Sequence, residues 1–208
     1  WIHGEEVVSK SGRTSPVYDP ALGVVTKEVA LANNDEIQAA IDSAKAAFPA
    51  WRDMSQARKQ VIMFKFRELL NAKKGELAEI ITSEHGKVLS DALGEITRGQ
   101  EVVEFATGMP HLLKGFYSEN VSTGVDVYST RQALGVVGII SPWNYPIQLA
   151  LIPAISAIAA GNRVWLKLSE RSPRTSGYLA TIIGEFFHPL ELCVTTGGED
   201  VARDFSEL

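Results

Sequence analysis

The stretch GVVGIISPWNYPIQLALIPAISAIAAGN, residues 135–162, decides the fold. No residue from Gln132 to Asn162 is charged, and none is a histidine. A transmembrane helix needs about 20 consecutive apolar residues that stay helical. This run contains residues that interrupt a helix, at Pro142, Asn144, Pro146 and Pro153. Because proline removes a backbone donor and disfavours helix at the preceding residue, we expect a buried core segment and no membrane span.

These interruptions divide the run into three pieces. ALGVVGII (133–140) is short, apolar and rich in β-branched residues, which predicts a strand buried on both faces of a parallel sheet. SPWNYP (141–146) is typical of a turn. IQLALIPAISAIAAG (147–161) predicts an apolar helix, with Pro146 at its first turn and Gly161 at its C′ position.

Strands and helices alternate through the rest of the chain. The expected elements are strand 134–140, helix 147–160, strand 163–168, helix 174–187 and strand 191–195. Alternation at this spacing indicates βαβ units and a parallel sheet. Just before them, residues 120–133 alternate polar and apolar side chains around Gly124, which predicts a hairpin.

The first part of the chain has a different pattern. Residues 1–31 predict short strands and turns, and residues 33–51 predict a helix that opens with Asn and Asp as cap candidates. Residues 55–74 predict an amphipathic helix, and further helical segments follow it. One face of that helix is expected to contain Val61, Phe64 and Leu69. The fold class expected is therefore α/β, with a helical lead-in before the first part of a nucleotide-binding domain.

Composition excludes several classes of protein. The 208 residues include 20 Lys and Arg against 25 Asp and Glu, so a nucleic-acid partner is not expected. The only cysteine, Cys193, rules out an intrachain disulfide and fits a reducing compartment. The first ten residues lack the pattern of a signal peptide, so we expect a cytoplasmic protein. No metal site is expected, because the histidines are scattered at His3, His85, His111 and His188.

In an open parallel sheet, ligands bind beyond the carboxyl ends of the strands. The first such end is IISPWNYP (139–146), in which Asn144 lies just ahead of a helix. There its side-chain N–H can point into the crevice, beside the positive end of the helix, and donate to a developing oxyanion. The alternative is that Asn144 only caps the helix.

The second strand end is VWLKLSERSP (164–173), where Lys167 and Glu170 follow an apolar strand. A cation and a carboxylate at this place fit a nucleotide, because the ammonium donates and the carboxylate accepts from ribose hydroxyls. The alternative is a solvated loop with an ordinary ion pair. The spacing of the two residues does not decide between them.

In order and spacing, GVVGIISPWNYP, PAISAIAAGN and KLSERSP resemble the cofactor-binding signature of the NAD(P)-dependent aldehyde dehydrogenase superfamily. The N-terminal stretches WIHGEE, YDPALG, AFPAWRDMSQARK and EHGKVLSDALGEI resemble the same family in the same order. Residues 1–140 are most similar to the methylmalonate-semialdehyde dehydrogenase group. Residues 141–208 look more like the coniferyl-aldehyde dehydrogenase group.

The resemblance implies a fold with a helical N-terminal layer and an incomplete Rossmann-like parallel sheet. Residues 1–119 would be the N-terminal strands and helices of the cofactor-binding domain. Residues 120–133 would form part of the oligomerisation hairpin of a homo-oligomer, a dimer or tetramer. Residues 134–208 would be the first βαβ units of the NAD(P)-binding domain.

By the same resemblance, Asn144 is the oxyanion-hole amide that stabilises a thiohemiacetal. The implied cofactor-binding residues are Ile140, Ser141, Pro142, Trp143, Lys167, Ser169 and Glu170. Ile140 would act partly through its backbone, and Lys167 and Glu170 would contact the adenosine ribose. Leu168 departs from the proline common at its position, although Lys167 and Glu170 flank it as in the family. The cofactor expected is NAD, because a carboxylate at 170 would repel a 2′-phosphate, while Lys167 leaves NADP open.

The implied reaction oxidises an aldehyde, either a semialdehyde or an aromatic one, to an acid or an acyl-CoA through a cysteine thiolate. In the family, that cysteine and the glutamate base lie further along than residue 208. We therefore expect an N-terminal part that is inactive alone, with coenzyme A left open as an acyl acceptor. Cys193 is not expected to be the nucleophile, because it falls in an apolar strand. The alternative is a non-catalytic nucleotide-binding or assembly module.

Overall fold

The computed structural model describes residues 2, 5–187 and 191–207. The first half contains β1 (Thr14–Asp19), β2 (Val24–Ala30), α1 (Asn34–Asp53), α2 (Gln56–His85), α3 (Leu89–Ala106) and α4 (Met109–Leu112). The second half contains β3 (Tyr117–Ser122), β4 (Val125–Tyr128), β5 (Val136–Ile140), α5 (Gln148–Ala159), β6 (Arg163–Ser169), α6 (Pro173–Phe186), β7 (Leu192–Gly197) and α7 (Glu199–Glu207).

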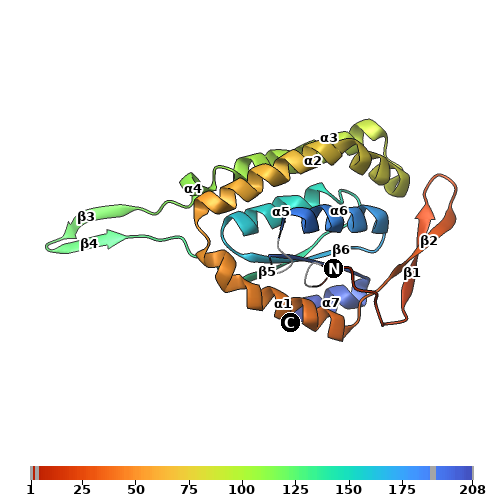
Figure 1. The fold of residues 1–208 in the computed structure, drawn as a ribbon, viewed down its shortest axis with the longest axis horizontal. Helices are drawn as coiled ribbons and strands as arrows, with labels where there is room; N and C mark the ends of the chain where they lie inside the picture. The colour runs from red at the N-terminus through yellow and green to blue at the C-terminus, as the bar shows by residue number, and fades with distance from the viewer. Residues whose placement is uncertain (1, 3–4, 188–190, 208) are drawn as a thin grey trace.

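The centre of the molecule is a parallel sheet in the order β5–β6–β7. Helices α5 and α6 cover one face of this sheet, with α2 and α3 packed outside them, and α1 and α7 cover the other face (Figure 1). Two apolar clusters fill the spaces on the two sides of the sheet. The α/β fold predicted from the alternation of strands and helices is therefore confirmed, and its element bounds agree within about two residues.

Strands β5 and β6 differ in burial. All seven residues of β6 are buried. The prediction that the preceding strand is buried on both faces is wrong, because Ile140 is 49% exposed and Gly138 is also exposed. The reason is position, since within the described residues β5 is an edge strand and pairs only with β6. The ring of Phe205 from α7 lies against Gly138, where an added Cβ would be 2.6 Å from it.

The orientation predicted for the second helix is also wrong. Val61 and Phe64 point outward and are each 52% exposed, although Leu69 is partly buried. Other residues form the buried stripe of α2. It consists of Lys59, Met63, Phe66, Leu70, Leu77, Ala78 and Ile81. The helix is formed as expected, but the side that it buries differs from the apolar face read in the sequence, since Lys59 is buried and Val61 and Phe64 are exposed.

Strands β3 and β4 form an arm that projects from the body of the molecule (Figure 1). The hairpin predicted around Gly124 is confirmed, and Gly124 has the positive φ of +72° that its turn requires. The predicted bounds of 120–133 are shifted, because the paired strands begin at residue 117 and end at residue 128. All ten strand residues are exposed.

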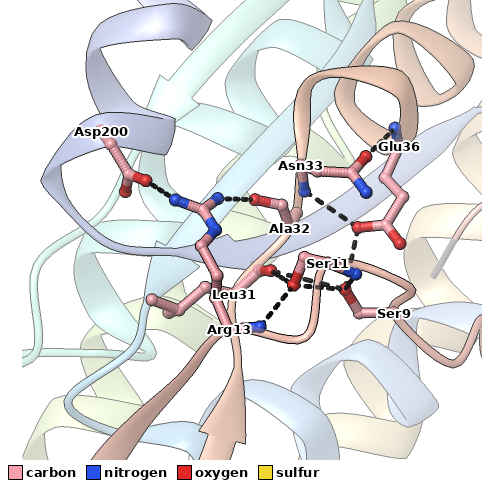
Figure 2. A network of polar contacts seen from close by, with 8 residues as sticks. All are labelled: Ser9, Ser11, Arg13, Leu31, Ala32, Asn33, Glu36 and Asp200. Atoms are coloured by element: carbon pink, nitrogen blue, oxygen red, sulfur yellow. Dashed lines mark hydrogen bonds and ion pairs between the residues drawn. The ribbon is translucent and has the colours of Figure 1, made fainter.

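The first helix begins with a cap made by its own sequence. The side chain of Asn33 accepts from the backbone N–H of Glu36 at 3.0 Å, and the Glu36 carboxylate accepts from the backbone N–H of Asn33 at 2.9 Å. This reciprocal pair confirms the prediction of an Asn cap. Figure 2 shows that Ser9 also contacts Glu36 and that Arg13 reaches Asp200 of α7. The N-terminal segment is thus tied to both helices on this face of the sheet.

Candidate functional site

The carboxyl ends of β5 and β6 lie side by side. Ile140 is in parallel register with Lys167, and the backbone N–H of Ser141 donates to the carbonyl of Lys167 at 3.0 Å. The two strand ends singled out in the sequence are therefore neighbours in space. They form one edge of the sheet, which is where open parallel sheets bind ligands.

On the β6 side, a buried cation faces a partly exposed carboxylate. The Lys167 ammonium lies 3.3 Å from the Glu170 carboxylate, and their side chains are 6% and 20% exposed. Ser169 is buried, and its hydroxyl accepts from the backbone N–H of Arg171 at 3.2 Å. Leu168 is buried in the larger core. The pair offers a donor and an acceptor at one point, a set that suits the two hydroxyls of a ribose.

On the β5 side, the turn after Ile140 is partly buried and partly open. Ser141 is buried, and among the residues that the structure describes its hydroxyl has no hydrogen-bond partner. Trp143 is 44% exposed, and the Arg171 guanidinium lies 4.5 Å from the centre of its ring. Trp143, Glu170 and Arg171 line one open pocket of about 520 Å³. This contact brings the two strand ends to a common pocket.

Asn144 lines a separate pocket of about 450 Å³. This pocket lies between the turn and residues 84–95, which comprise the end of α2, the connection and the start of α3 and are called the α2–α3 corner below. Its other walls include Lys87 and Glu95 from the corner and Arg98 from α3. The Arg98 guanidinium is 68% exposed and pairs with Glu101 at 2.8 Å. The Asn144 amide and the exposed Arg98 cation thus line the same pocket.

The alternative role of Asn144, as the cap of the following helix, is contradicted. Helix α5 begins at Gln148, two residues after Pro146, with Ile147 in the cap position and no side-chain cap from its own turn. The cap comes from Glu95 of α3. One oxygen of its carboxylate accepts from the backbone N–H groups of Ile147 at 2.7 Å and Gln148 at 3.3 Å.

Lys87 completes this arrangement. Its ammonium donates to the second oxygen of Glu95 at 2.8 Å and to the backbone carbonyl of Asn144 at 2.7 Å. The Glu95 side chain is fully buried, and that of Lys87 is 9% exposed. Sequence reasoning missed both residues, because they precede Asn144 by about 50 positions and carry no local motif.

Helix α6 is capped in the same way from the other side of the corner. Glu84 accepts from the backbone N–H groups of Arg174 at 2.5 Å and Thr175 at 2.8 Å, and from the Thr175 hydroxyl at 2.7 Å. Like α5, this helix has no side-chain cap from its own N-cap residue. Both helices that follow the site strands are therefore capped by carboxylates from the α2–α3 corner.

The single cysteine has the properties of a core residue. Cys193 lies in β7 and is 2% exposed, which agrees with the buried strand predicted there. Burial raises the pKa of its thiol from 9 to about 11. A thiol with this pKa is almost wholly protonated at neutral pH and is a poor nucleophile.

Among residues 2, 5–187 and 191–207, no helix is both long and apolar enough to cross a bilayer. In that same part of the chain, no group of three or more His, Cys, Asp or Glu side chains is arranged to hold a metal ion. Two of the four histidines, His3 and His188, lie outside the described residues.

The chain was compared with known proteins. Residues 7–207 match the model of the aldehyde dehydrogenase family. A malonate-semialdehyde dehydrogenase of Pseudomonas aeruginosa is 42% identical over 187 residues, covering 90% of this chain and 37% of that protein. An acylating methylmalonate-semialdehyde dehydrogenase of Arabidopsis thaliana, named as mitochondrial, is 44% identical over 184 residues, covering 88% of this chain and 30% of that protein.

Among solved structures, a Sinorhizobium meliloti protein described as a methylmalonate-semialdehyde dehydrogenase, in complex with NAD, superposes with a TM-score of 0.91. It is 40% identical and is matched over 98% of this chain and 42% of its own. The chain thus spans less than half the length of these relatives. The similarity of residues 141–208 to the coniferyl-aldehyde group stays a prediction, because the matches to semialdehyde dehydrogenases run through that region as well. This protein belongs to the aldehyde dehydrogenase family.

Proposed function

We propose that the edge formed by the ends of β5 and β6 binds NAD and supplies Asn144 to the oxidation of a short semialdehyde. The observation that carries this proposal is the Lys167–Glu170 pair, a buried ammonium beside a partly exposed carboxylate. Lys167 is in register with Ile140, the last strand residue before the turn that holds Asn144. Relatives named as semialdehyde dehydrogenases, one of them in complex with NAD, support the choice of cofactor and substrate class.

The residues at this edge fit the cofactor. Lys167 and Glu170 provide a donor and an acceptor for the adenosine ribose, and the carboxylate favours NAD over NADP by repelling a 2′-phosphate. Bound NAD would supply the acceptor for the hydride. The remaining residues proposed to line the cofactor are Ile140, Ser141, Pro142, Trp143 and Ser169.

Asn144 acts on the substrate oxygen in this proposal. A cysteine thiolate adds to the aldehyde carbon, and the former carbonyl oxygen takes the negative charge. The side-chain N–H of Asn144 donates to that oxygen. With NAD bound as the hydride acceptor, the same carbon would become a thioester of the cysteine. Water would then release an acid, or coenzyme A an acyl-CoA, with the cysteine thiol as the leaving group. We place the nucleophile outside these 208 residues, because the thiol of Cys193 is buried and protonated.

The pocket beside Asn144 suits an aldehyde that carries a carboxylate. Arg98 lines this pocket, and its exposed guanidinium can exchange the carboxylate of Glu101 for that of a substrate. Malonate and methylmalonate semialdehydes, the substrates in the names of the relatives, have a carboxylate two bonds from the aldehyde carbon. An aromatic aldehyde offers no such group.

The proposed organisation follows the family resemblance. Residues 1–119 and 134–208 together form the cofactor-binding part, and residues 120–133 belong to an arm through which copies of the protein form a dimer or tetramer. The exposed, apolar-rich strands β3 and β4 support that role for the arm. A cytoplasmic location is proposed with it, on the single reduced cysteine.

The test follows NADH absorbance after mixing the purified chain with NAD+ and malonate semialdehyde. We expect NAD+ binding without turnover from the 208 residues. We expect turnover when they continue into a cysteine-bearing segment. Activity of the 208-residue chain that is abolished in Cys193→Ser would contradict the placement of the nucleophile. A natural stop codon directly after residue 208 would favour a non-catalytic binding module.

In the complete enzyme, Asn144→Ala should lower kcat by roughly 100-fold or more, because it removes a donor to the developing charge. The KM for NAD+ should change little, since the ribose contacts stay intact. The matched control is Asn71→Ala, which alters an exposed Asn on α2 far along the helix from the corner. A near-normal kcat in Asn144→Ala would remove this residue from the chemistry.

A further inference from the structure

We propose that Lys87 and Glu95 are positioning residues, which hold the backbone of Asn144 in place and neutralise each other beside its amide. This inference rests on the proposed function of Asn144. It assigns a role in the reaction to the α2–α3 corner, which lies about 50 residues before the catalytic turn in the sequence.

The geometry holds the turn at two points. At the end of the turn, Glu95 accepts from the backbone N–H groups of Ile147 and Gln148. At its middle, Lys87 donates to the carbonyl of Asn144 at 2.7 Å. Lys87 and Glu95 also bond to each other at 2.8 Å, so the two points of attachment are connected through one ion pair.

The charges explain why a pair is needed. The negative Glu95 suits the positive end of α5, but an isolated carboxylate would oppose negative charge developing near Asn144. Lys87 removes that conflict, since its ammonium lies between Glu95 and Asn144. It also lies 4.2 Å from the centre of the Tyr145 ring, which packs the cation against the turn.

A contribution to the stability of the fold does not by itself explain why this ion pair is present. A serine or aspartate at position 147 could cap α5 locally, as Asn33 caps α1. A buried ion pair is often no more stabilising than apolar side chains of the same size. The pair does what a local cap cannot do, because one of its members also reaches the backbone of the proposed catalytic residue.

The test separates positioning from folding. Lys87→Met, Glu95→Gln and the double variant are compared in the 208-residue chain, with Glu104→Gln as a control on the exposed side of α3. Two quantities are followed, the midpoint of urea unfolding and the NMR signals of the Asn144 backbone and side-chain amides, before and after NAD+. Each single variant leaves one buried charge unpaired, so its unfolding midpoint should fall. The double variant removes both charges, so its midpoint should recover.

If the pair positions Asn144, the amide signals of Asn144 stay displaced in the double variant, because its carbonyl has lost the Lys87 donor. Glu104→Gln should leave the Asn144 signals unchanged and change the unfolding midpoint only slightly, because its ion pair with Arg67 is exposed. Recovery of the Asn144 signals together with the unfolding midpoint would overturn the proposal and reduce the pair to a structural role. Failure of the proposed function has a different signature, in which NAD+ shifts no signal of residues 140–144 or 167–170 in the unmodified chain.

Discussion

Helices α1 and α5 cover opposite faces of the same sheet, but they are capped in opposite ways. The cap of α1 is made by Asn33 and Glu36, three residues apart. That of α5 is made by Glu95, 52 positions before the N–H group it accepts from. The first cap forms as soon as its helix does, and the second exists only after α3 has packed against α5. The proposed catalytic turn is therefore organised by tertiary packing and not by its own sequence.

A second helix, α6, is also capped by a residue far away in the sequence. Glu84 and Glu95 both lie in the α2–α3 corner, and they cap α6 and α5, the helices that follow the two site strands. The two caps are not equivalent. Glu95 is fully buried and paired with a cation, whereas Glu84 is partly exposed, and the groups it accepts from are backbone N–H groups and a hydroxyl.

The largest expected effect comes from breaking the buried cap. Glu95→Ala removes the acceptor for Ile147 and leaves the Lys87 ammonium buried without its carboxylate. We expect the free energy of unfolding to fall by about 3–5 kcal/mol, the cost of removing one partner of a buried pair. Urea unfolding measures it. A loss below about 1 kcal/mol, as for an exposed pair, would mean that the corner does not hold the turn.

A smaller effect is expected at the cap of α6. Glu84→Ala leaves no buried cation behind, so the free energy of unfolding should fall by about 0.5–2 kcal/mol, as for the loss of an ordinary helix cap. Asn33→Ala at the local cap of α1 should fall in the same range and serves as the reference. If Glu84→Ala cost as much as Glu95→Ala, the distinction between the two caps would be wrong.

The smallest effect concerns His85, which lies in the corner between the two pockets. Burial, and then the charge of Lys87, lower the pKa of its imidazole below the usual 6.5. As pH falls through 6.5 towards the folded pKa, the unfolded chain binds the proton more readily, so stability declines. Above pH 6.5 the imidazole is neutral in both states and contributes nothing to this dependence. His85→Gln should flatten that acid-side decline in unfolding free energy, and parallel curves for the two proteins would exclude the effect.

Local signals in the sequence predicted a good part of the fold. The order of strands and helices, the hairpin at Gly124 and the Asn cap of α1 all depend on residues near each other in the chain, and the structure confirms them. The same holds for the two strand ends, because parallel strands bring Ile140 and Lys167 together at one edge.

The wrong predictions depended on packing. Periodicity gave α2 an apolar face with Val61 and Phe64, but the helix buries the neighbouring stripe that faces α3 and α6. Composition could not reveal that β5 lies at an edge. Nor could any spacing identify Glu95 and Lys87, because the residues that meet them are about 50 positions away.

The central claim is that the Lys167–Glu170 pair binds the ribose of NAD at the ends of β5 and β6. The most direct measurement is a calorimetric titration of NAD+ into the unmodified chain, Glu170→Gln and Glu185→Gln, the last an exposed glutamate on α6 as a matched control. Loss of a charged acceptor should weaken binding about tenfold in Glu170→Gln, with no change in Glu185→Gln. Equal affinity in all three proteins, or no binding to the unmodified chain, would contradict the claim.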